Sequence, residues 1–295
     1  MLLRCRPAGL CGAQTKREPE GGAQKVKLVT YSVGGGEPRV GRLQDGAVQP
    51  LGAPDMISYI RGGGEPEGEP VPLEEARLHA PVLNPQKIIA IGLNYEDHAN
   101  ETGAPIPEKP IVFAKYANTL VGAGEEVRIP PITSQADYEA ELAVVIGREA
   151  KNVSEEEALE YVFGYTNCND VSSRDLQFSE GGQWTRSKSL DTFCPLGPYV
   201  ATRDEIPDPQ SLRIRSVLNG EVMQDSNTSK MIFPVARLIS FLSTGMTLVP
   251  GDIIATGTPA GVGFARDPKV FLKDGDEISI EIEGLGRLTN PVREE

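Results

Sequence analysis

The stretch that most constrains the fold is the acidic sequence Asp-Tyr-Glu-Ala-Glu at residues 137–141, which leads directly into the apolar run at 142–146. Such a run, closed by Gly147, predicts a buried β-strand. Side chains two residues apart on a strand share a face, so Glu139 and Glu141 are predicted to point the same way. Two adjacent carboxylates entering a core repel each other unless a positive group lies between them. The sequence therefore requires a compensating cation at this point.

A third acid, Asp170, follows another strand-like run at residues 161–166. Three carboxylates with no histidine or cysteine beside them suit a hard divalent cation such as Mg²⁺ or Mn²⁺, with Ca²⁺ as a further possibility. The other interpretation is that Glu139 and Glu141 lie on a solvated face or pair with lysine or arginine. Both interpretations stay open at this level.

Composition and charge narrow the class of protein. The chain has 295 residues, 39% of them hydrophobic, and a formal net charge of −13, which predicts a soluble globular protein with one large domain and a smaller one. No apolar stretch approaches the roughly 20 residues of a membrane span, so no membrane partner is expected, and the acidity disfavours nucleic acid. The cysteines at 5, 11, 168 and 194 match neither a metal knuckle nor a disulfide framework, which predicts reduced thiols and a cytoplasmic location.

Short segments organise the chain. Residues 1–25 are rich in arginine, glycine and proline without periodicity, and we expect a disordered extension there. Alternating short strands broken by glycine turns predict a small N-terminal β domain over residues 26–83. The larger unit, residues 84–295, opens with a strand at 87–91. Strands do not alternate with long helices, so a Rossmann fold or an α/β barrel is disfavoured.

The larger unit presents a histidine soon after its first strand. Residues 94–101 are predicted to form a short helix, and His98 and Glu101, three positions apart, then share one face of it. Residues 102–110, with prolines at 105, 107 and 110, predict an irregular loop. The chain contains only two histidines, which draws attention to His98, although a surface helix histidine remains the alternative.

Several spaced motifs then coincide in order. They are Gly92-Leu93-Asn94-Tyr95 with His98 and Glu101, Asp137-Tyr138-Glu139 with Glu141, Asn169-Asp170-Val171-Ser172 with Arg174, Asp175 and Gln177, then Lys188, Asn219-Gly220, and Gly257-Thr258-Pro259 with Gly261-Val262-Gly263. As a set they resemble the fumarylacetoacetate hydrolase superfamily, in its shorter branch of acylpyruvases and fumarylacetoacetate hydrolase domain-containing proteins. The resemblance covers roughly residues 85–295.

The resemblance implies a β-rich α+β fold, a mixed β-sandwich roll preceded by a small N-terminal β domain, and a homodimer. It also implies roles for individual residues: Glu139, Glu141 and Asp170 as ligands of Mg²⁺ or Mn²⁺, His98 and Glu101 as a water-activating dyad on a lid, Lys188 as a catalytic lysine, and Arg174, Gln177 and Thr258 as substrate-facing residues.

The reaction implied first is hydrolysis of a carbon–carbon bond in a 2,4-dioxo acid, an acylpyruvate, fumarylpyruvate or fumarylacetoacetate-like substrate. The His98–Glu101 dyad would activate water, and the metal and Lys188 would stabilise the enolate. Because the same enolate forms without water, a decarboxylase or isomerase of a 2-oxo-hexenedioate or of oxaloacetate, acting in aromatic catabolism, is the alternative. A non-enzymatic binding protein on this scaffold is the third reading. In the first two cases the partner is a small anionic 2-oxo acid.

Overall fold

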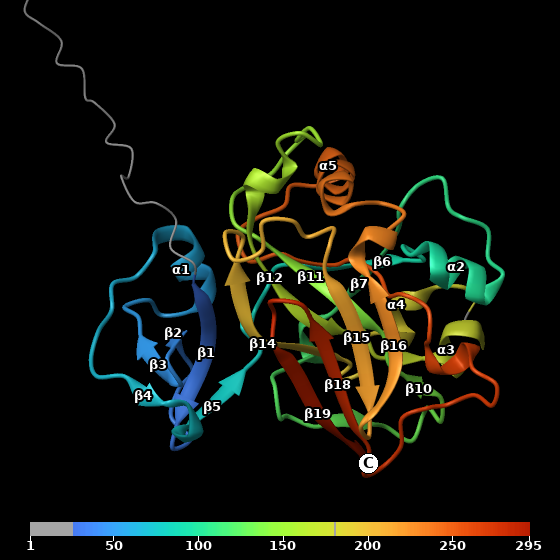
Figure 1. Ribbon diagram of the computed structural model, residues 1–295, viewed down its shortest axis with the longest axis horizontal. Coiled ribbons are helices and arrows are strands. Elements are labelled where there is room, and N and C mark those ends of the chain that lie inside the picture. Colours follow the sequence, from blue (N-terminus) through green and yellow to red (C-terminus); the bar gives the residue numbers. More distant parts are fainter. Residues whose placement is uncertain (1–25, 180) are drawn as a thin grey trace, which may run out of the picture.

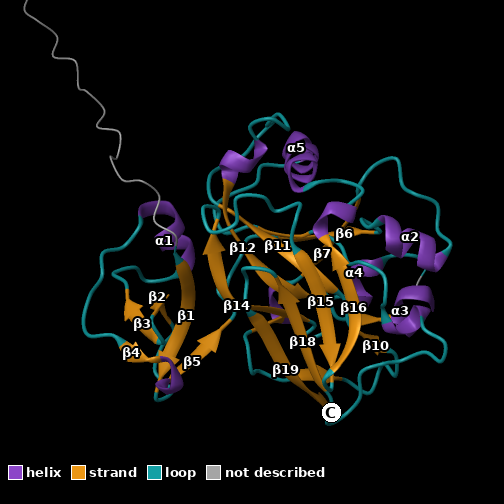
Figure 2. Cartoon of the chain, in the orientation of Figure 1, coloured by secondary structure: helices purple, strands orange, loops and turns teal. Residues whose placement is uncertain are grey.

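The computed structural model describes residues 26–179 and 181–295, so the extension expected over residues 1–25 lies outside the described residues. In the described part, strands make up most of the regular structure and the helices lie around them (Figure 2). The predicted β-rich α+β fold is confirmed. In the same part of the chain, every helix is too short or too polar to cross a bilayer.

A small β unit occupies one end of the molecule, in blue in Figure 1. It contains β1 (Lys27–Val33), β2 (Arg39–Gln44), β3 (Ala47–Pro50), α1 (Met56–Gly62), β4 (Val71–Pro72), the 3₁₀ helix η1 (Leu73–Glu75) and β5 (Ala76–His79). Within the small unit, strand β1 pairs with β2 and β5. It also pairs with β14 (Cys194–Thr202) of the larger unit. The small unit therefore extends the main sheet. The predicted boundary near residue 83 falls in the connection between β5 and β6.

The main sheet continues through the larger unit in the order β14, β12, β11, β17, β6, β7, and β8 pairs with β14. These strands are β6 (Ile88–Gly92), β7 (Ile111–Lys115), β8 (Leu120–Val121), β11 (Ala140–Ile146), β12 (Val162–Asn169) and β17 (Ile253–Ala255). Strand β11 pairs antiparallel with both β12 and β17, whereas β17 and β6 are parallel. Every residue of β11 is buried, which explains the uninterrupted apolar run there, because a strand covered on both faces needs no polar side chain.

A second sheet packs over β11. Its order is β16 (Glu221–Asn227), β15 (Arg213–Leu218), β18 (Glu277–Ile282), β19 (Arg287–Glu294) and β9 (Val127–Ile129), and a short pair is formed by β10 (Ala136–Asp137) and β13 (Ser172–Ser173). Leu142 and Val144 of β11 share one apolar core with Ile280 of β18, while Ala143 and Val145 belong to a second core on the other face. Glu139 and Glu141 are separated from Ala143 and Val145 by even numbers of residues, so they are expected on this second face.

Short helices gather at the end of the molecule opposite the small unit (Figure 1). They are α2 (Glu96–Thr102), α3 (Arg174–Ser179) and α4 (Trp184–Ser187). The remaining helices are α5 (Val235–Gly245) and the 3₁₀ turns η2 (Ala117–Thr119), η3 (Ala158–Tyr161), η4 (Thr228–Lys230) and η5 (Gly263–Ala265). The predicted functional residues lie at the start of β11, after β12, on or directly after α2, α3 and α4, and in the loop that follows β17.

Candidate active site

Strand pairing brings the three predicted metal ligands together. Glu139 precedes β11 and Asp170 follows β12, and the two strands pair with Ala140 opposite Asn169. The amide of Asp170 donates to the carbonyl oxygen of Glu139 at 3.0 Å, which closes this end of the ladder. One carboxylate oxygen from each of Glu139, Glu141 and Asp170 lies within 4.8 Å of the others, and all three residues are buried.

Three buried basic side chains lie around this carboxylate cluster. Lys188 donates to Glu139 Oε2 at 2.7 Å and to Asp170 Oδ2 at 2.8 Å. Arg174 donates from Nη2 to Glu139 Oε1 at 2.6 Å and from Nε to Asp137 Oδ2 at 2.9 Å. Lys115, at the end of β7, donates to Asp170 Oδ1 at 2.6 Å. The interpretation of the glutamates as a solvated face is therefore wrong, because the carboxylates lie inside the protein and are partly compensated by side chains.

The compensation is incomplete. Four carboxylates (Asp137, Glu139, Glu141 and Asp170) face three cationic side chains. Burial would raise the pKa of Glu139, but the charges of Lys188 and Arg174 outweigh it and lower that pKa to about 2. For Glu141, burial and the neighbouring charges of Asp170 and Glu139 together raise the pKa well above its ordinary value. Among the described residues, Glu141 is thus the one carboxyl group of the four without an ion-pair partner, and its raised pKa favours the neutral, protonated form while no cation is bound.

The donor set fits a hard divalent cation. All three candidate ligand atoms are carboxylate oxygens, as Mg²⁺ and Mn²⁺ prefer. A divalent cation beside Glu141 would favour the ionised form of that carboxyl group and supply the positive charge that no described side chain provides there. A backbone donor already fixes one oxygen of this carboxyl group: the amide of Gly257 donates to Glu141 Oε2 at 2.9 Å. Gly257 has φ +94°, and a Cβ there would lie 2.7 Å from the Cβ of Asn94, so glycine is needed at this close approach.

The predicted dyad forms on α2. His98 Nδ1 lies 3.2 Å from Glu101 Oε2, as the three-residue spacing on a helix predicts. The other oxygen of Glu101 accepts the amide of Gly261 at 2.8 Å, so Glu101 is fixed from two sides. With Nδ1 engaged by Glu101, Nε2 is the ring nitrogen available for proton transfer. The His98 ring also packs edge-on against Phe264, with centroids 6.5 Å apart.

A cavity of about 450 Å³ collects most of the predicted site residues. Its lining includes His98, Glu139, Glu141, Arg174, Gln177, Lys188 and Thr258. Glu101 and Asp170 stand behind this lining, in contact with it through His98 and Lys188 respectively. Gln177 accepts a hydrogen bond from Arg174 at 2.9 Å, and Thr258 accepts one from Gln224 at 2.7 Å. The structure thus joins all nine predicted residues in one site.

The rest of the lining is mostly apolar. Ile106 lies in the loop after α2 and Ile111 begins the next strand, and Phe178, Trp184 and Phe264 come from three other segments. Trp184 lies against Phe113, and a Cβ on Gly92 would lie 2.2 Å from the Trp184 ring. The site therefore combines a charged floor with apolar walls, and apolar surroundings strengthen electrostatic interactions at the floor because they lower the local dielectric constant.

Sequence reasoning missed three groups of this site. Lys115 and Asp137 belong to the charge network, and Gln224 positions Thr258 and donates to the carbonyl oxygen of Pro259 at 2.8 Å. A lysine that closes the apolar strand 111–115 was a usable signal for Lys115. Asp137 lies two residues before Glu139, at the same two-residue spacing as the glutamates. Nothing near Gln224 in the sequence marks it.

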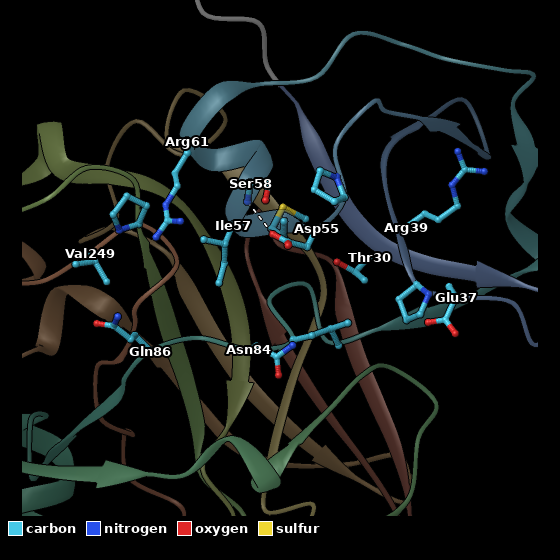
Figure 3. A pocket seen from close by; sticks show the side chains of 15 residues that line it. Thr30, Glu37, Arg39, Asp55, Ile57, Ser58, Arg61, Asn84, Gln86 and Val249 are labelled. Carbon is cyan, nitrogen blue, oxygen red and sulfur yellow. Dashed lines mark hydrogen bonds between the residues drawn. The ribbon is translucent and has the colours of Figure 1, made fainter.

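A second cavity, of about 520 Å³, lies where the small unit meets the main sheet (Figure 3). Arg61 stands on one side of it, and Arg39 and Glu37 stand on the other. Asp55 is engaged as the cap of α1, accepting the amide of Ser58 at 2.7 Å, and Arg39 pairs with Glu67 at 3.0 Å. These charged groups do not converge on one point, so this cavity is not the candidate active site.

Known proteins resemble both units of this chain. A family model described as Rv2993c-like, N-terminal, matches residues 27–81. The oxaloacetate tautomerase fahd2, mitochondrial, of Xenopus laevis is 50% identical over 216 residues, 73% of this chain and 68% of that protein. The crystal structure of a 2-hydroxyhepta-2,4-diene-1,7-dioate isomerase from Mycobacterium marinum superposes with a TM-score of 0.79 at 38% identity, over 92% of this chain and 99% of that one.

A third relative carries a hydrolase name. It is the fumarylacetoacetate hydrolase of the psychrophile Exiguobacterium antarcticum, with a TM-score of 0.80 at 38% identity over 92% of this chain and all of that one. The family model for the fumarylacetoacetate (FAA) hydrolase C-terminal region matches residues 87–293, the part of the chain that holds every residue of the site. With this match and a relative at 50% identity, the chain belongs to the fumarylacetoacetate hydrolase family.

Proposed function

We propose that the chain is a metal-dependent isomerase of small 2-oxo acids and that it interconverts the enol and keto forms of oxaloacetate. The observation that carries the proposal is a proton-transfer pair, His98–Glu101, in one cavity with a carboxylate cluster that lacks one positive charge. The oxaloacetate tautomerase names of the relatives support the substrate. This places the isomerase, the alternative at the level of the sequence, ahead of hydrolysis.

Each residue has a part that its position supports. Glu139, Glu141 and Asp170 would hold a divalent cation, which when bound acts as a Lewis acid toward the oxygens of a 2-oxo acid. Arg174 and Lys188 add positive charge at the charged floor that would face an anionic substrate. Gln177 and Thr258 offer polar atoms in the same cavity. The substrate carboxylate and the enolate oxygen are therefore expected on the charged floor, away from the apolar walls.

The reaction needs one proton to leave carbon 3 and one to reach the 2-oxo oxygen, or the reverse. His98 Nε2 would take the proton from one of these two atoms and deliver it to the other, so that the enzyme gains and loses no net proton, and Glu101 keeps the ring oriented through Nδ1. The enolate is stabilised by the positive charge of Lys188 beside it. The apolar rings of Trp184 and Phe264 in the same lining disfavour an ordered attacking water molecule, which favours isomerisation over hydrolysis.

Hydrolysis of an acylpyruvate remains a second candidate, because the same dyad could activate a water molecule and one structural relative is named a hydrolase. The named dienedioate isomerase supports a third substrate class, a longer unsaturated diacid from aromatic catabolism.

A homodimer is also proposed: β7 is the edge of the main sheet, and Ile111 and Val112 on it are exposed. The cytoplasmic location stays a prediction.

The test follows the decay of enol-oxaloacetate absorbance with wild type, His98→Ala and His79→Ala, each with Mn²⁺ and with EDTA. Removal of a positioned general base costs about 10²–10⁴-fold, so His98→Ala should lose that much while wild type with EDTA falls toward the buffer rate. His79 is the matched control, since it is the chain's other histidine and bonds to Ser32 at 2.8 Å in the small unit.

The results below would refute the tautomerase or replace it with another function. A wild-type enzyme with Mn²⁺ that leaves the enol decay at the buffer rate refutes the tautomerase. If that enzyme releases pyruvate from an acylpyruvate instead, the hydrolase takes its place. Binding of oxalate without turnover of either substrate would support the non-enzymatic binding protein.

A further inference from the structure

Asp97 stands beside His98 in the sequence but contacts a different part of the protein. Its Oδ2 accepts the hydroxyl of Ser226 at 2.6 Å and the ammonium of Lys230 at 3.1 Å. Its Oδ1 accepts the amide of Ala260 at 3.3 Å. Ser226 belongs to β16 and Lys230 to η4, so a single carboxylate joins α2 to three segments that are remote in sequence. It does not line the cavity of the candidate active site.

Asp97 and Glu101 act on the same loop. They are four residues apart on α2 and therefore share a face. The amide of Ala260 donates to Asp97 and the next amide, that of Gly261, donates to Glu101 at 2.8 Å. The loop that carries these two amides also carries Thr258 of the site. Contacts on this face thus fix the dyad helix and the loop relative to each other.

Helix α2 depends on such contacts. It has seven residues, and a helix of that length is unstable without tertiary support. Its entry is fixed by Asn94, whose side chain donates to the carbonyl oxygen of Thr256 at 2.7 Å and accepts the amide of Phe233 at 2.8 Å. The Asn94 anchor precedes the helix, so the orientation of the helix itself is left to Asp97, Glu101 and the packing of its buried side chains.

We propose that Asp97 is a positioning residue: by binding Ser226, Lys230 and the Ala260 amide, it holds α2 docked on the 257–263 loop with His98 facing the carboxylate cluster. The link to turnover rests on the proposed function, whereas docking can be measured without substrate. A simpler role is also conceivable, because an acid in the first turn of a helix favours its dipole. Substitutions in Ser226 and Lys230 separate the two roles, since they leave the sequence of α2 intact.

Hydrogen exchange of the α2 amides, read by mass spectrometry on the full chain, measures docking directly. A hydrogen bond to a charged group contributes about 1.5–3 kcal/mol, so Ser226→Ala should raise exchange in α2 roughly 10-fold or more. Lys230 is half exposed, and an exposed ion pair contributes little, so Lys230→Met should raise it only a few-fold and Lys230→Arg should restore the wild-type rate. Asp97→Ala should raise exchange in α2 as much as Ser226→Ala does. The double variant Asp97→Ala/Ser226→Ala should exchange little faster than Asp97→Ala alone.

Asp225→Asn is the matched control. Asp225 neighbours Ser226 on β16 but pairs with Arg213 at 2.5 Å on an exposed surface, so α2 exchange should stay at the wild-type rate. In the enol-oxaloacetate assay, the loss of kcat should follow the rank of the exchange rates across these variants. Wild-type exchange in α2 of both Asp97→Ala and Ser226→Ala would overturn the proposal, as would an equal rise in β11 and β12, which indicates general loss of stability.

The two hypotheses fail in different ways. An active enzyme whose α2 exchange is unaffected by these substitutions refutes the role of Asp97 alone. A chain that turns over no 2-oxo acid but shows the expected exchange pattern refutes the proposed function, while the docking role of Asp97 stands.

Discussion

Replacing Lys115 with methionine tests whether the carboxylate cluster is a cation site. The Lys115 side chain and its partner Asp170 are both 0% exposed, and the ion pair measures 2.6 Å. The same ammonium group also donates to the carbonyl oxygens of Val171 and Lys188. Methionine fills similar space without charge. The substitution therefore removes one of the three positive charges around four carboxylates and leaves the packing largely filled.

The expected loss of stability follows from this burial. Breaking a buried ion pair by removing one partner costs about 3–5 kcal/mol. Asp170 keeps its bond to Lys188 at 2.8 Å, so the metal-free variant should lose an amount near the lower limit, about 3 kcal/mol. At roughly 2 °C per kcal/mol for a chain of this size, the melting temperature should fall by about 6 °C. The cluster would then have one positive charge fewer around it, so Mn²⁺ should bind the variant more tightly than the wild type and recover part of the loss.

The assay is thermal unfolding in EDTA and in rising Mn²⁺, for wild type, Lys115→Met and Lys87→Met. Lys87 is the control because it also makes a 2.7 Å ion pair with a fully buried aspartate, Asp252, and neither residue belongs to the carboxylate cluster. Lys87→Met should have a lower melting temperature than the wild type in EDTA, and Mn²⁺ should raise that melting temperature no more than it does for the wild type. The same result for Lys115→Met would refute the reasoning, because the cluster would then not sense a divalent cation.

Three further predictions follow from the site. Glu139→Ala should abolish Mn²⁺ binding in calorimetry while circular dichroism shows the fold intact; unchanged affinity would contradict the assigned ligand. Because the folded pKa of Glu139, about 2, lies below its ordinary value of 4.5, its contribution to stability is present above pH 4.5 and lost as the pH falls toward 2. Acid titration of the metal-free protein by urea unfolding should therefore show a shallower loss in Glu139→Gln than in wild type, and identical curves would count against the buried network. Finally, oxalate with Mn²⁺ should slow hydrogen exchange in residues 95–110, the predicted lid, because the apolar wall that Ile106 contributes would close over the ligand; equal exchange with and without oxalate would argue against a lid.

The local features of the site could be read from the sequence because they depend on backbone periodicity. The run at 142–146 forms β11, and the two-residue period places Glu139 and Glu141 on its second face. The three-residue spacing on α2 brings His98 to Glu101. These relations hold within one strand or one turn of helix, where the chain itself fixes the distances.

Longer-range relations could not be read this way. The sequence required a cation beside the two glutamates but left its source open. In the structure, strand and helix placement brings Lys115 and Lys188 to Asp170 and brings Arg174 to Glu139. The second partner of Glu101, the amide of Gly261, lies 160 residues away in the chain.

The sequence by itself thus determined the chemical groups of the site and the faces on which they stand. Tertiary structure decided which cation compensates each acid and which carboxylate, Glu141, is left without one. The physical reason is that charge compensation acts through space over a few ångströms in a buried environment. Those distances are set by the pairing of β11 with β12 and by the docking of α2, α3 and α4 beside them.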